Sequence, residues 1–242
     1  MMFDTDRELL AIMSHEILTP LNAIDGYVEV LTSGLRGPVT APQRADLERI
    51  RLSGRHLQRL VTNMLALARL EHGRLDVTLD DVALDETLHE AADLIAPQLT
   101  VKGIHYEHQY CPPDLRVWAD ANRLRQVIVN LLSNAYKYTA PGGRVVLRCL
   151  VADHEVHVEV EDTGCGIPSD QLQTIFDPFV QVGTARAARE GVGLGLTISR
   201  AIARQMRGDL TVRSALGVGS AFLLSLPRVG FPRLALAVGS RS

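Results

Sequence analysis

The hydrophobic period changes once along this chain, and that change limits what the chain can fold into. From about Asp6 to Gly73, apolar residues recur at steps of three and four, as in amphipathic helices. The first run consists of Leu10, Met13, Ile17, Leu21, Ile24, Val28, Leu31 and Leu35, and the second of Leu47, Ile50, Gly54, Leu57, Val61, Met64 and Ala68. The stretch GLRGPVTAPQ, rich in glycine and proline, separates them. The pattern therefore predicts a hairpin of two helices, each about 28 residues and roughly 40 Å long.

A hairpin of two such helices buries only one face of each helix. Its apolar stripes match the repeat of a coiled-coil seam, so we expect the hairpin to pair with a second copy of the chain in a four-helix bundle. The alternative is a hairpin that packs on the remainder of its own chain.

Beyond Gly73 the pattern mixes strands with helices. Alternation of valines with polar residues predicts a strand in EVHVEVE, and further strands are expected near 104–110, 115–120, 144–152, 209–214 and 220–226. The segment LDVTLDDVALDET is expected to form a short strand and a turn that lead into a helix. Helices are expected after Asp85 and Asp120, whose side chains would cap them, and near 169–176 and 194–207. The helix after Asp85 would carry Leu88, Ala92, Ile95 and Leu99 on one apolar face. Because strands and helices do not strictly alternate, this order predicts an α+β fold with two layers.

Composition and charge exclude several classes of protein. Across 242 residues, 25 Lys+Arg against 28 Asp+Glu give a net charge of -3, which lacks the basic footprint of a dedicated nucleic-acid binder. No apolar run is long enough for a transmembrane helix, and the acidic opening MMFDTDRELL is not a signal peptide. The helical pattern starts so early that we expect an upstream part to have been removed. We expect no structure in the tail 230–242.

The chain has three cysteines, Cys111, Cys149 and Cys165. Their odd number and wide spacing predict neither a disulfide framework nor a zinc site. We expect buried or incidental thiols in a reducing cytosol.

His15 lies in the segment SHEILTP on the first predicted helix. At 3.6 residues per turn, it points about 155° away from the centre of the apolar stripe, so it faces outward. Glu16 follows directly, and Pro20 cannot donate a hydrogen bond to the carbonyl of Glu16, which predicts a bend beside the histidine. An imidazole next to a carboxylate suits nucleophilic chemistry, with Glu16 as base or orienting group. The alternative is an ordinary exposed histidine.

A second set of polar residues lies on the helix predicted after Asp120. Asn130 and Asn134 are four residues apart and share one face, and Lys137 and Tyr138 follow at the end of the helix. Amide oxygens are hard ligands that suit Mg²⁺, and Lys137 can meet a phosphate as a point charge. Alternatively, the two asparagines are solvent-facing residues near a helix end.

Two glycine-rich segments complete the candidate site. In DTGCGIP, Asp162 ends a strand, and Gly164 and Gly166 allow the close backbone approach that a flat base requires; the alternative is a plain strand-to-helix turn. The segment GVGLGL, residues 191–196, precedes a helix, so its amides and the helix N-terminus form a seat for phosphate. The charged stretch RAARE before it is expected to act as a mobile lid.

Taken in order, these segments resemble the cytoplasmic catalytic core of a bacterial sensor histidine kinase. The likeness extends from about Arg7 to Pro227. SHEILTPL is similar to the H box, DANRLRQVIVNLLSNAYKYT to the N box, DTGCGI to the G1 box, IFDPF to the F box, GVGLGL to the G2 box, and GVGSAF to a late glycine box. The resemblance implies a dimerisation and histidine phosphotransfer hairpin at 1–73, followed at 74–229 by a catalytic ATP-binding domain of the Bergerat fold, a two-layer α/β sandwich.

The resemblance also implies roles for individual residues. His15 would accept the phosphoryl group with Glu16 as the adjacent acid–base residue, and Thr19 would position water for dephosphorylation of a partner. Asn134 would hold Mg²⁺ beside Asn130. The implied ATP-binding residues are Asn130, Asn134, Lys137 at the phosphates, Tyr138 in the pocket wall, Asp162 at the adenine amino group with its loop glycines Gly164 and Gly166, and Gly191, Gly193, Gly195 and Leu196 at the triphosphate.

Two other functions fit parts of the pattern. A Bergerat-fold ATPase would place a glutamate four residues before the metal-binding asparagine to activate water, where this chain has Asn130. A degenerate dimeric scaffold would bind nucleotide and partner without catalysis, against which the intact His15, Asn134 and Asp162 argue. We therefore expect a cytoplasmic protein-histidine kinase that uses ATP and Mg²⁺, forms a homodimer through the hairpin and passes its phosphoryl group to the receiver domain of a response regulator. This segment is expected to contact neither nucleic acid nor membrane.

Overall fold

The structure is a computed structural model that describes residues 2–71, 77–181 and 193–230. Within the first of these ranges, side chains are described for residues 16–55, 57, 58 and 60–62. The chain divides into two compact units, Met1–Arg74 and Leu75–Ser242. Of the predicted tail 230–242, all but Gly230 lies outside the described residues. In the described ranges, no helix is both long enough and apolar enough to cross a membrane.

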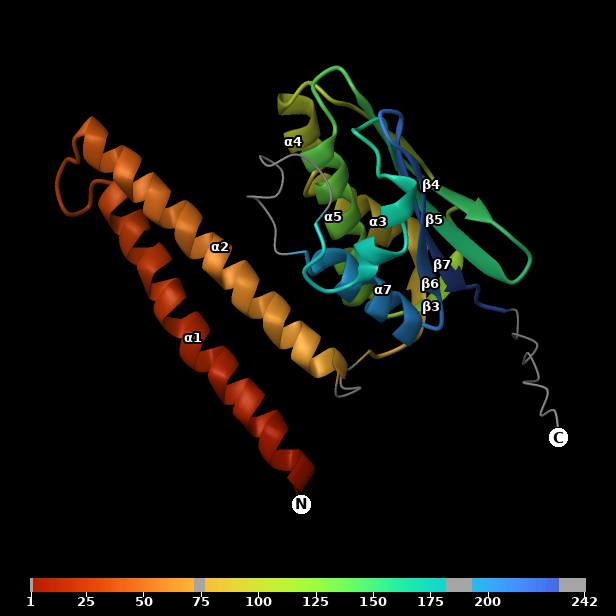
Figure 1. Cartoon of the computed structure of the whole chain (residues 1–242), viewed down its shortest axis with the longest axis horizontal. Coiled ribbons are helices and arrows are strands. Elements are labelled where there is room, and N and C mark those ends of the chain that lie inside the picture. Colours follow the sequence, from red (N-terminus) through yellow and green to blue (C-terminus); the bar gives the residue numbers. More distant parts are fainter. Residues whose placement is uncertain (1, 72–76, 182–192, 231–242) are drawn as a thin grey trace. The chain divides into compact units, whose positions relative to one another are not determined.

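The first unit is a hairpin of two long helices, α1 (Met2–Thr32) and α2 (Ala41–Glu71) (Figure 1). The chain leaves α1 through Gly34, whose φ of +77° is a left-handed conformation typical of a helix end. Thr40 then caps α2 reciprocally with Gln43. The Gln43 N–H donates to the Thr40 hydroxyl at 3.4 Å, and the Thr40 N–H donates to the Gln43 side-chain carbonyl at 2.9 Å. This capping explains where the predicted break ends.

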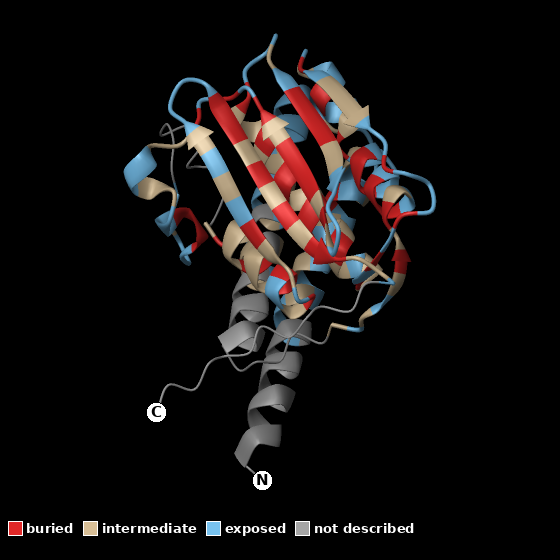
Figure 2. Cartoon of the chain, turned by 90° about the vertical axis from the view of Figure 1, so that its right-hand side faces the viewer, coloured by how far each residue is buried: buried red, intermediate tan, exposed pale blue. Residues whose placement is uncertain are grey.

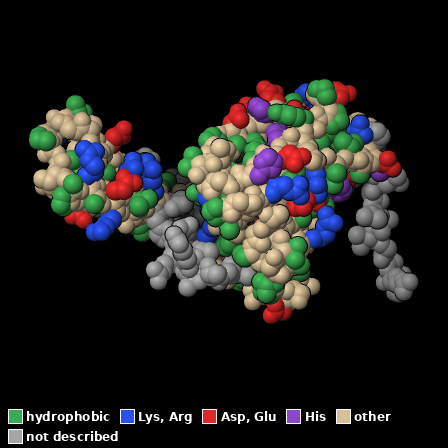
Figure 3. Space-filling view, turned by 90° about the horizontal axis from the view of Figure 1, so that it is seen from above, with side chains coloured by type: hydrophobic (Ala, Val, Ile, Leu, Met, Phe, Trp, Pro, Cys, Tyr) green, Lys and Arg blue, Asp and Glu red, His purple; other side chains and the backbone are tan. Residues whose placement is uncertain are grey.

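The predicted apolar stripe of the hairpin is only partly covered within one chain. Val28 is buried, whereas Ile17, Ile24 and Leu31 of the same stripe are 38%, 43% and 38% exposed. On α2, Leu57 is 49% exposed. Figure 3 shows hydrophobic side chains beside charged ones on the surface of the hairpin. One copy of the hairpin therefore leaves much of its described stripe in contact with water.

The second unit is a two-layer α+β sandwich (Figure 1). In chain order, its described elements are β1 (Asp80–Ala83), α3 (Leu84–Asp93), α4 (Ala96–Val101), β2 (His105–Gln109), β3 (Arg116–Ala119), α5 (Ala121–Tyr138), β4 (Arg144–Val151), β5 (Glu155–Asp162), the short 3₁₀ helices η1 (Ser169–Gln171) and η2 (Thr174–Phe176), α7 (Gly195–Gln205), β6 (Asp209–Ala215) and β7 (Gly219–Pro227). The main sheet has the strand order β2-β4-β5-β7-β6, with β2 and β4 parallel and the other neighbours antiparallel. Strands β1 and β3 form a separate antiparallel pair.

Helices α3, α5 and α7 lie on one side of the main sheet, and Figure 2 shows the other side. Alternation along β5 places Val156, Val158 and Val160 on one face of the strand, and each is at most 1% exposed. Ile128 and Leu131 of α5 are also fully buried. The core therefore lies between the sheet and its helices, and the predicted two-layer α+β fold is confirmed.

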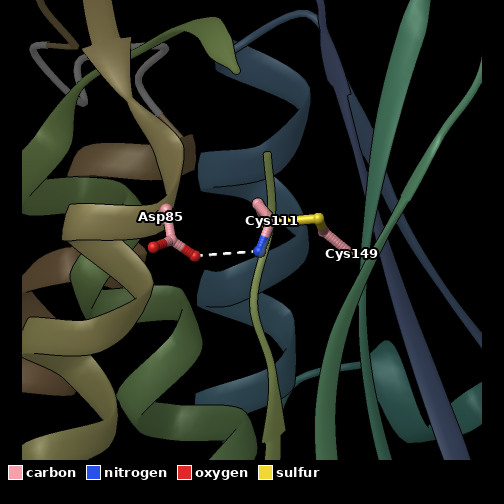
Figure 4. The surroundings of a disulfide bond; sticks show 3 residues. All are labelled: Asp85, Cys111 and Cys149. Atoms are coloured by element: carbon pink, nitrogen blue, oxygen red, sulfur yellow. Dashed lines mark hydrogen bonds between the residues drawn. A yellow bond between two sulfur atoms is a disulfide. The ribbon is translucent and has the colours of Figure 1, made fainter. Parts of the chain in front are cut away.

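Asp85 does not cap the helix that follows the first strand, contrary to the sequence prediction. The N-cap is Ala83, which makes no side-chain capping hydrogen bond, and α3 already begins at Leu84. The Asp85 carboxylate instead accepts a hydrogen bond from the backbone N–H of Cys111 at 2.9 Å (Figure 4). The carboxylate therefore anchors a distant loop rather than its own helix.

The apolar face predicted after Asp85 belongs to two helices rather than one. Helix α3 ends at Asp93 and α4 begins at Ala96. Pro97 has no N–H and cannot donate to the carbonyl of Asp93, as a continuous helix would require. The predicted apolar residues are nevertheless all buried: Leu88, Ala92, Ile95 and Leu99.

Cys111 and Cys149 form a disulfide bond, which corrects the prediction of unpaired thiols for these two residues (Figure 4). Cys149 lies on β4, and Cys111 lies two residues beyond β2, the strand that runs parallel to β4. The two cysteines are 38 positions apart in sequence, so only the order of strands in the sheet brings them together. Cys165 is a free and exposed cysteine.

The packing of α5 on the sheet can be tested at Leu131, which is fully buried. We expect Leu131→Ala to lower the free energy of unfolding by about 2–5 kcal/mol, because the removed methyl groups leave a cavity. Urea unfolding followed by circular dichroism measures the loss. Gln126→Ala, at an exposed position on the same helix, is the matched control and should change stability by less than about 0.5 kcal/mol. Equal losses in the two variants would contradict the described core.

Candidate functional site

Two segments of the second unit contact α5, the loop after β5 and helix α7. The loop after β5 reaches the end of α5, where the N–H of Cys165 donates to the carbonyl of Tyr138 at 3.3 Å. Helix α7 reaches the middle of α5, where Asn130 Nδ2 donates to Ser199 Oγ at 2.9 Å. The asparagine-bearing helix, the DTGCGIP loop and α7 are therefore neighbours.

Helix α5 begins after Asp120, as predicted. Asp120 Oδ1 accepts a hydrogen bond from the backbone N–H of Arg123 at 3.1 Å, which satisfies one of the unpaired donors of the first turn. Asn130 and Asn134 are half-buried one turn apart on the flank of this helix. Since Ile128 and Leu131 hold one side of α5 in the core, the two amides project from another side of the helix.

Asn130 links α5 to the first turn of α7. A Cβ at Gly195, the first residue of α7, would lie 2.5 Å from Asn130 Oδ1, so a side chain there would displace the Asn130 amide. Ser199, the hydrogen-bond partner of Asn130, is 2% exposed and was missed by sequence reasoning. The available signal was its spacing: Ser199 follows Gly195 by four residues and therefore lies on the same side of α7.

Asp162 ends β5 and is 7% exposed. Its Oδ1 accepts a hydrogen bond from the N–H of Gly164 at 2.8 Å. Burial raises the pKa of the Asp162 carboxyl above its ordinary value of 3.8, while hydrogen bonds from the backbone of Gly164 and Ser220 oppose that rise. The carboxylate is thus buried and fixed in orientation by the loop that follows it.

The glycines of this loop make the close backbone approach that the sequence predicts. A Cβ at Gly164 would lie 2.6 Å from Asp162 Oδ1 and 2.7 Å from the carbonyl oxygen of Tyr138. Gly166 has a φ of +67°, and a Cβ there would collide with the carbonyl of Ala215. A side chain at either position would displace the loop from α5 or from β6.

The end of α5 carries a cation beside an aromatic ring. Lys137 Nζ lies 4.9 Å from the centre of the Tyr138 ring, and both side chains are half-buried. The carbonyl of Tyr138 is bonded to the loop that follows Asp162. The residue that carries the ring is therefore joined through its backbone to the loop that begins at the buried carboxylate of Asp162.

The start of α7 has the backbone features of an anion-binding helix end. Gly193 has a φ of +75°, and Leu194 at the N-cap makes no side-chain capping hydrogen bond, so the N-cap residue does not compete for the N–H groups of the first turn. Leu196 is half-buried in that turn. Gly191 and the stretch RAARE, which was expected to form a lid, lie outside the described residues.

The predicted nucleophile lies in the other unit. His15 is part of α1, but its side chain is outside the described side chains, while Glu16 and Thr19 of the same helix are exposed. Helix α1 continues through Pro20 to Thr32. Because Pro20 has no N–H, the carbonyl of Glu16 lacks its usual helical donor.

Chemically, the site in the second unit suits a ligand with a flat polar base and a chain of phosphates. The buried carboxylate of Asp162 next to tightly packed backbone can accept a hydrogen bond from a base. The amide oxygens on α5 can bind a hard cation. The ammonium of Lys137 and the N-terminus of α7 can bind negatively charged phosphates.

Two family models match the chain, one in each unit. The model described as His Kinase A (phospho-acceptor) domain, HisKA, matches residues 5–73. The model described as histidine kinase-, DNA gyrase B-, and HSP90-like ATPase, HATPase_c, matches residues 119–230.

Individual relatives match over nearly the whole chain. Circadian input-output histidine kinase CikA of Thermosynechococcus vestitus is 35% identical over 93% of this chain and 31% of its own length. Histidine protein kinase DivJ of Caulobacter vibrioides is 34% identical over 93% of this chain and 38% of its own length. The chain thus spans about a third of the length of these curated relatives. The crystal structure of full-length ShkA in complex with AMPPNP is similar with a TM-score of 0.76 and 35% identity, over 91% of this chain and 46% of that one.

The hydrogen bond between Asn130 and Ser199 can be measured with a double-mutant cycle. We expect Ser199→Ala to lower the free energy of unfolding by about 1 kcal/mol, because the half-buried Asn130 amide loses its partner. In the Asn130→Ala background, the loss of stability caused by Ser199→Ala should be smaller than in the unaltered protein by roughly 0.5 kcal/mol at least, since the hydrogen bond is already absent. Urea unfolding of the four proteins gives the coupling energy. Strict additivity would contradict a direct bond between the two side chains.

Proposed function

Because the chain belongs to the histidine kinase family, of which it forms a catalytic core, we propose that it transfers the γ-phosphoryl group of ATP to His15. From there the group would pass to an aspartate in the receiver domain of a response regulator. The observation that carries this proposal is the convergence of Asn130, Asp162 and Gly195 around α5, in a domain whose family binds ATP.

For ATP, we propose that Asp162 accepts a hydrogen bond from the adenine amino group, in the loop shaped by Gly164 and Gly166. The fixed orientation and burial of this carboxylate support the assignment. Tyr138 would line the pocket and Lys137 would meet the phosphates. The triphosphate would lie at the first turn of α7, with Gly191, Gly193, Gly195 and Leu196 around it.

The residues beside the phosphate seat also fit a magnesium ion. Asn134 is half-buried one turn after Asn130, and amide oxygens are among the hard ligands that Mg²⁺ accepts. We propose that Asn134 holds the ion, with Asn130 beside it. When bound, Mg²⁺ neutralises charge on the phosphates.

The transfer step uses the imidazole of His15 as nucleophile. A ring nitrogen attacks the γ-phosphorus in line, and a nitrogen–phosphorus bond forms. The bond from the γ-phosphorus to the bridging oxygen breaks, and ADP leaves with the electron pair. Glu16, the next residue, orients the ring and accepts its proton. The exposed position of Glu16 on α1 supports a role that needs access to a second domain.

We propose that two hairpins associate into a four-helix bundle, so that residues 1–73 act as the dimerisation and phosphotransfer domain and residues 74–229 as the ATP-binding domain. The partial exposure of Ile17, Ile24 and Leu31 supports this, because a second copy would cover the same stripe. The proposed location is the cytoplasm, where ATP and receiver domains are present, and nucleic acid is not a proposed partner.

Position 130 favours transfer to histidine over hydrolysis. A Bergerat-fold ATPase would need a glutamate there to activate water, whereas the Asn130 amide is engaged with Ser199 and is not a base. We further propose that Thr19 positions water for dephosphorylation of the response regulator. Thr19 is exposed and four residues beyond His15, so the two residues share one side of α1.

Autophosphorylation tests the assignment of His15. Incubated with γ-labelled ATP and Mg²⁺, the protein should label itself with a bond that is stable to base and labile to acid. His15→Gln should abolish labelling while ATP binding, measured by calorimetry, stays within about twofold. His105→Gln, at an exposed histidine on β2, is the matched control and should label normally. Undiminished labelling of His15→Gln would refute the assignment.

Thr19→Ala separates kinase from phosphatase activity. We expect autophosphorylation to be unchanged, because the hydroxyl takes no part in the transfer to His15. A phosphorylated receiver domain should lose its phosphoryl group at least roughly tenfold more slowly with the variant than with the unaltered protein, since a misplaced water reacts poorly. Equal decay rates would exclude this role for Thr19.

A further inference from the structure

The C-terminal end of α5 has an unusual arrangement of hydrogen-bond partners. The last four carbonyls of a helix have no partner within the helix and must find one elsewhere. In α5, the carbonyl of Ala135 accepts from the N–H of Thr139 at 3.0 Å, and that of Tyr138 accepts from Cys165 at 3.3 Å. The carbonyls of Tyr136 and Lys137 between them remain to be accounted for.

Both remaining carbonyls are bound by the side chain of Lys102. Lys102 Nζ donates to the carbonyl oxygen of Tyr136 at 2.5 Å and to that of Lys137 at 3.4 Å. The same ammonium lies 4.7 Å from the centre of the Tyr136 ring. In the part of the chain that the structure describes, the recorded partners of Lys102 are thus two carbonyls and a ring, with no carboxylate among them.

The backbone on both sides holds Lys102 in this position. Lys102 is the C-cap of α4, and the next residue, Gly103, has a φ of +75°. The N–H of Gly142 donates to the carbonyl of Gly103 at 2.8 Å, and the N–H of His105 donates to the carbonyl of Gly143 at 2.9 Å. The turn that carries Lys102 is therefore fastened to the turn that follows α5.

We propose that Lys102 is a positioning residue of the nucleotide site and acts through Lys137. This inference rests on the proposed function, in which Lys137 meets the phosphates. The C-terminal end of a helix carries partial negative charge and attracts nearby ammonium groups, including one from its own last turn. Lys102 neutralises that end from outside, so the Lys137 ammonium is directed toward the ligand instead of back to its own carbonyls.

The composition of the chain supports separate roles for the two lysines, with Lys102 positioning Lys137 and Lys137 meeting the phosphates. Of 25 Lys+Arg residues, the sequence contains lysine only at positions 102 and 137, and both lie at this helix end. A compact ammonium with three donors can reach two adjacent carbonyls and a ring at once, whereas a guanidinium spreads its donors over a planar fork. Lysine is therefore the residue type that suits both positions.

Binding of MgATP and of adenosine to Lys102→Met distinguishes positioning from a general structural effect. We expect the dissociation constant for MgATP to rise on the order of tenfold, which corresponds to about 1.4 kcal/mol. The constant for adenosine, which has no phosphates, should change by less than about twofold. Arg204→Met, which removes a cation from the last turn of α7, is the matched control and should leave both constants unchanged.

The Lys137→Met background shows whether Lys102 acts through Lys137. In that background, Lys102→Met should weaken MgATP binding by less than about twofold, because the group that it positions is already absent. If Lys102→Met does not fold, as judged by circular dichroism, Lys102→Gln replaces it in both experiments, because glutamine retains two N–H donors without the charge. Lys102→Gln should then show the binding changes expected of Lys102→Met.

An unchanged constant for MgATP in either Lys102 variant, equal weakening of MgATP and adenosine, or full additivity with Lys137→Met would each overturn the inference. Failure of the unaltered protein to bind MgATP would instead overturn the proposed function, together with the role of Lys102.

Discussion

The second unit depends on the amphipathic character of helix α5. Leu131 and Ile128 fix one side of the helix in the core, so Asn130 and Asn134 must leave it along a different side. The cap at Asp120 sets where this pattern begins. Because the same helix fills the core and carries the polar groups, the position of the site follows from the packing of the apolar residues.

The other parts of the site approach α5 only because they lack side chains at specific positions. Gly195 lets the first turn of α7 reach Asn130, and Gly164 lets the loop after β5 reach Tyr138. Either Cβ would lie closer than 3 Å to an atom of α5: a side chain at Gly195 would displace the Asn130 amide, and one at Gly164 would meet the backbone of Tyr138. In the first unit, by contrast, the apolar stripe is left partly open, which suits a domain that is completed by a second copy.

Local sequence rules predicted much of this fold. Alternation in β5, the cap at Asp120 and the need for glycine at Gly164 are present as expected, because each depends on residues a few positions apart. The rules failed where a neighbour in space competes with one in sequence. Asp85 was expected to cap its own helix, yet it accepts a hydrogen bond from Cys111. Ser199 belongs to no motif, and its spacing from Gly195 places it on one side of α7 without showing that it contacts Asn130.

The sequence by itself determined the two hydrophobic periods, hence a helical hairpin followed by an α+β sandwich, and the residue types of a nucleotide site. These features follow from propensity and spacing along one chain. The tertiary structure alone decided which segments meet. It brings Lys102 to the end of α5 and Cys111 to Cys149, because both pairings depend on the order of strands and the path of turns. Such contacts join residues more than 30 positions apart, where no local rule acts.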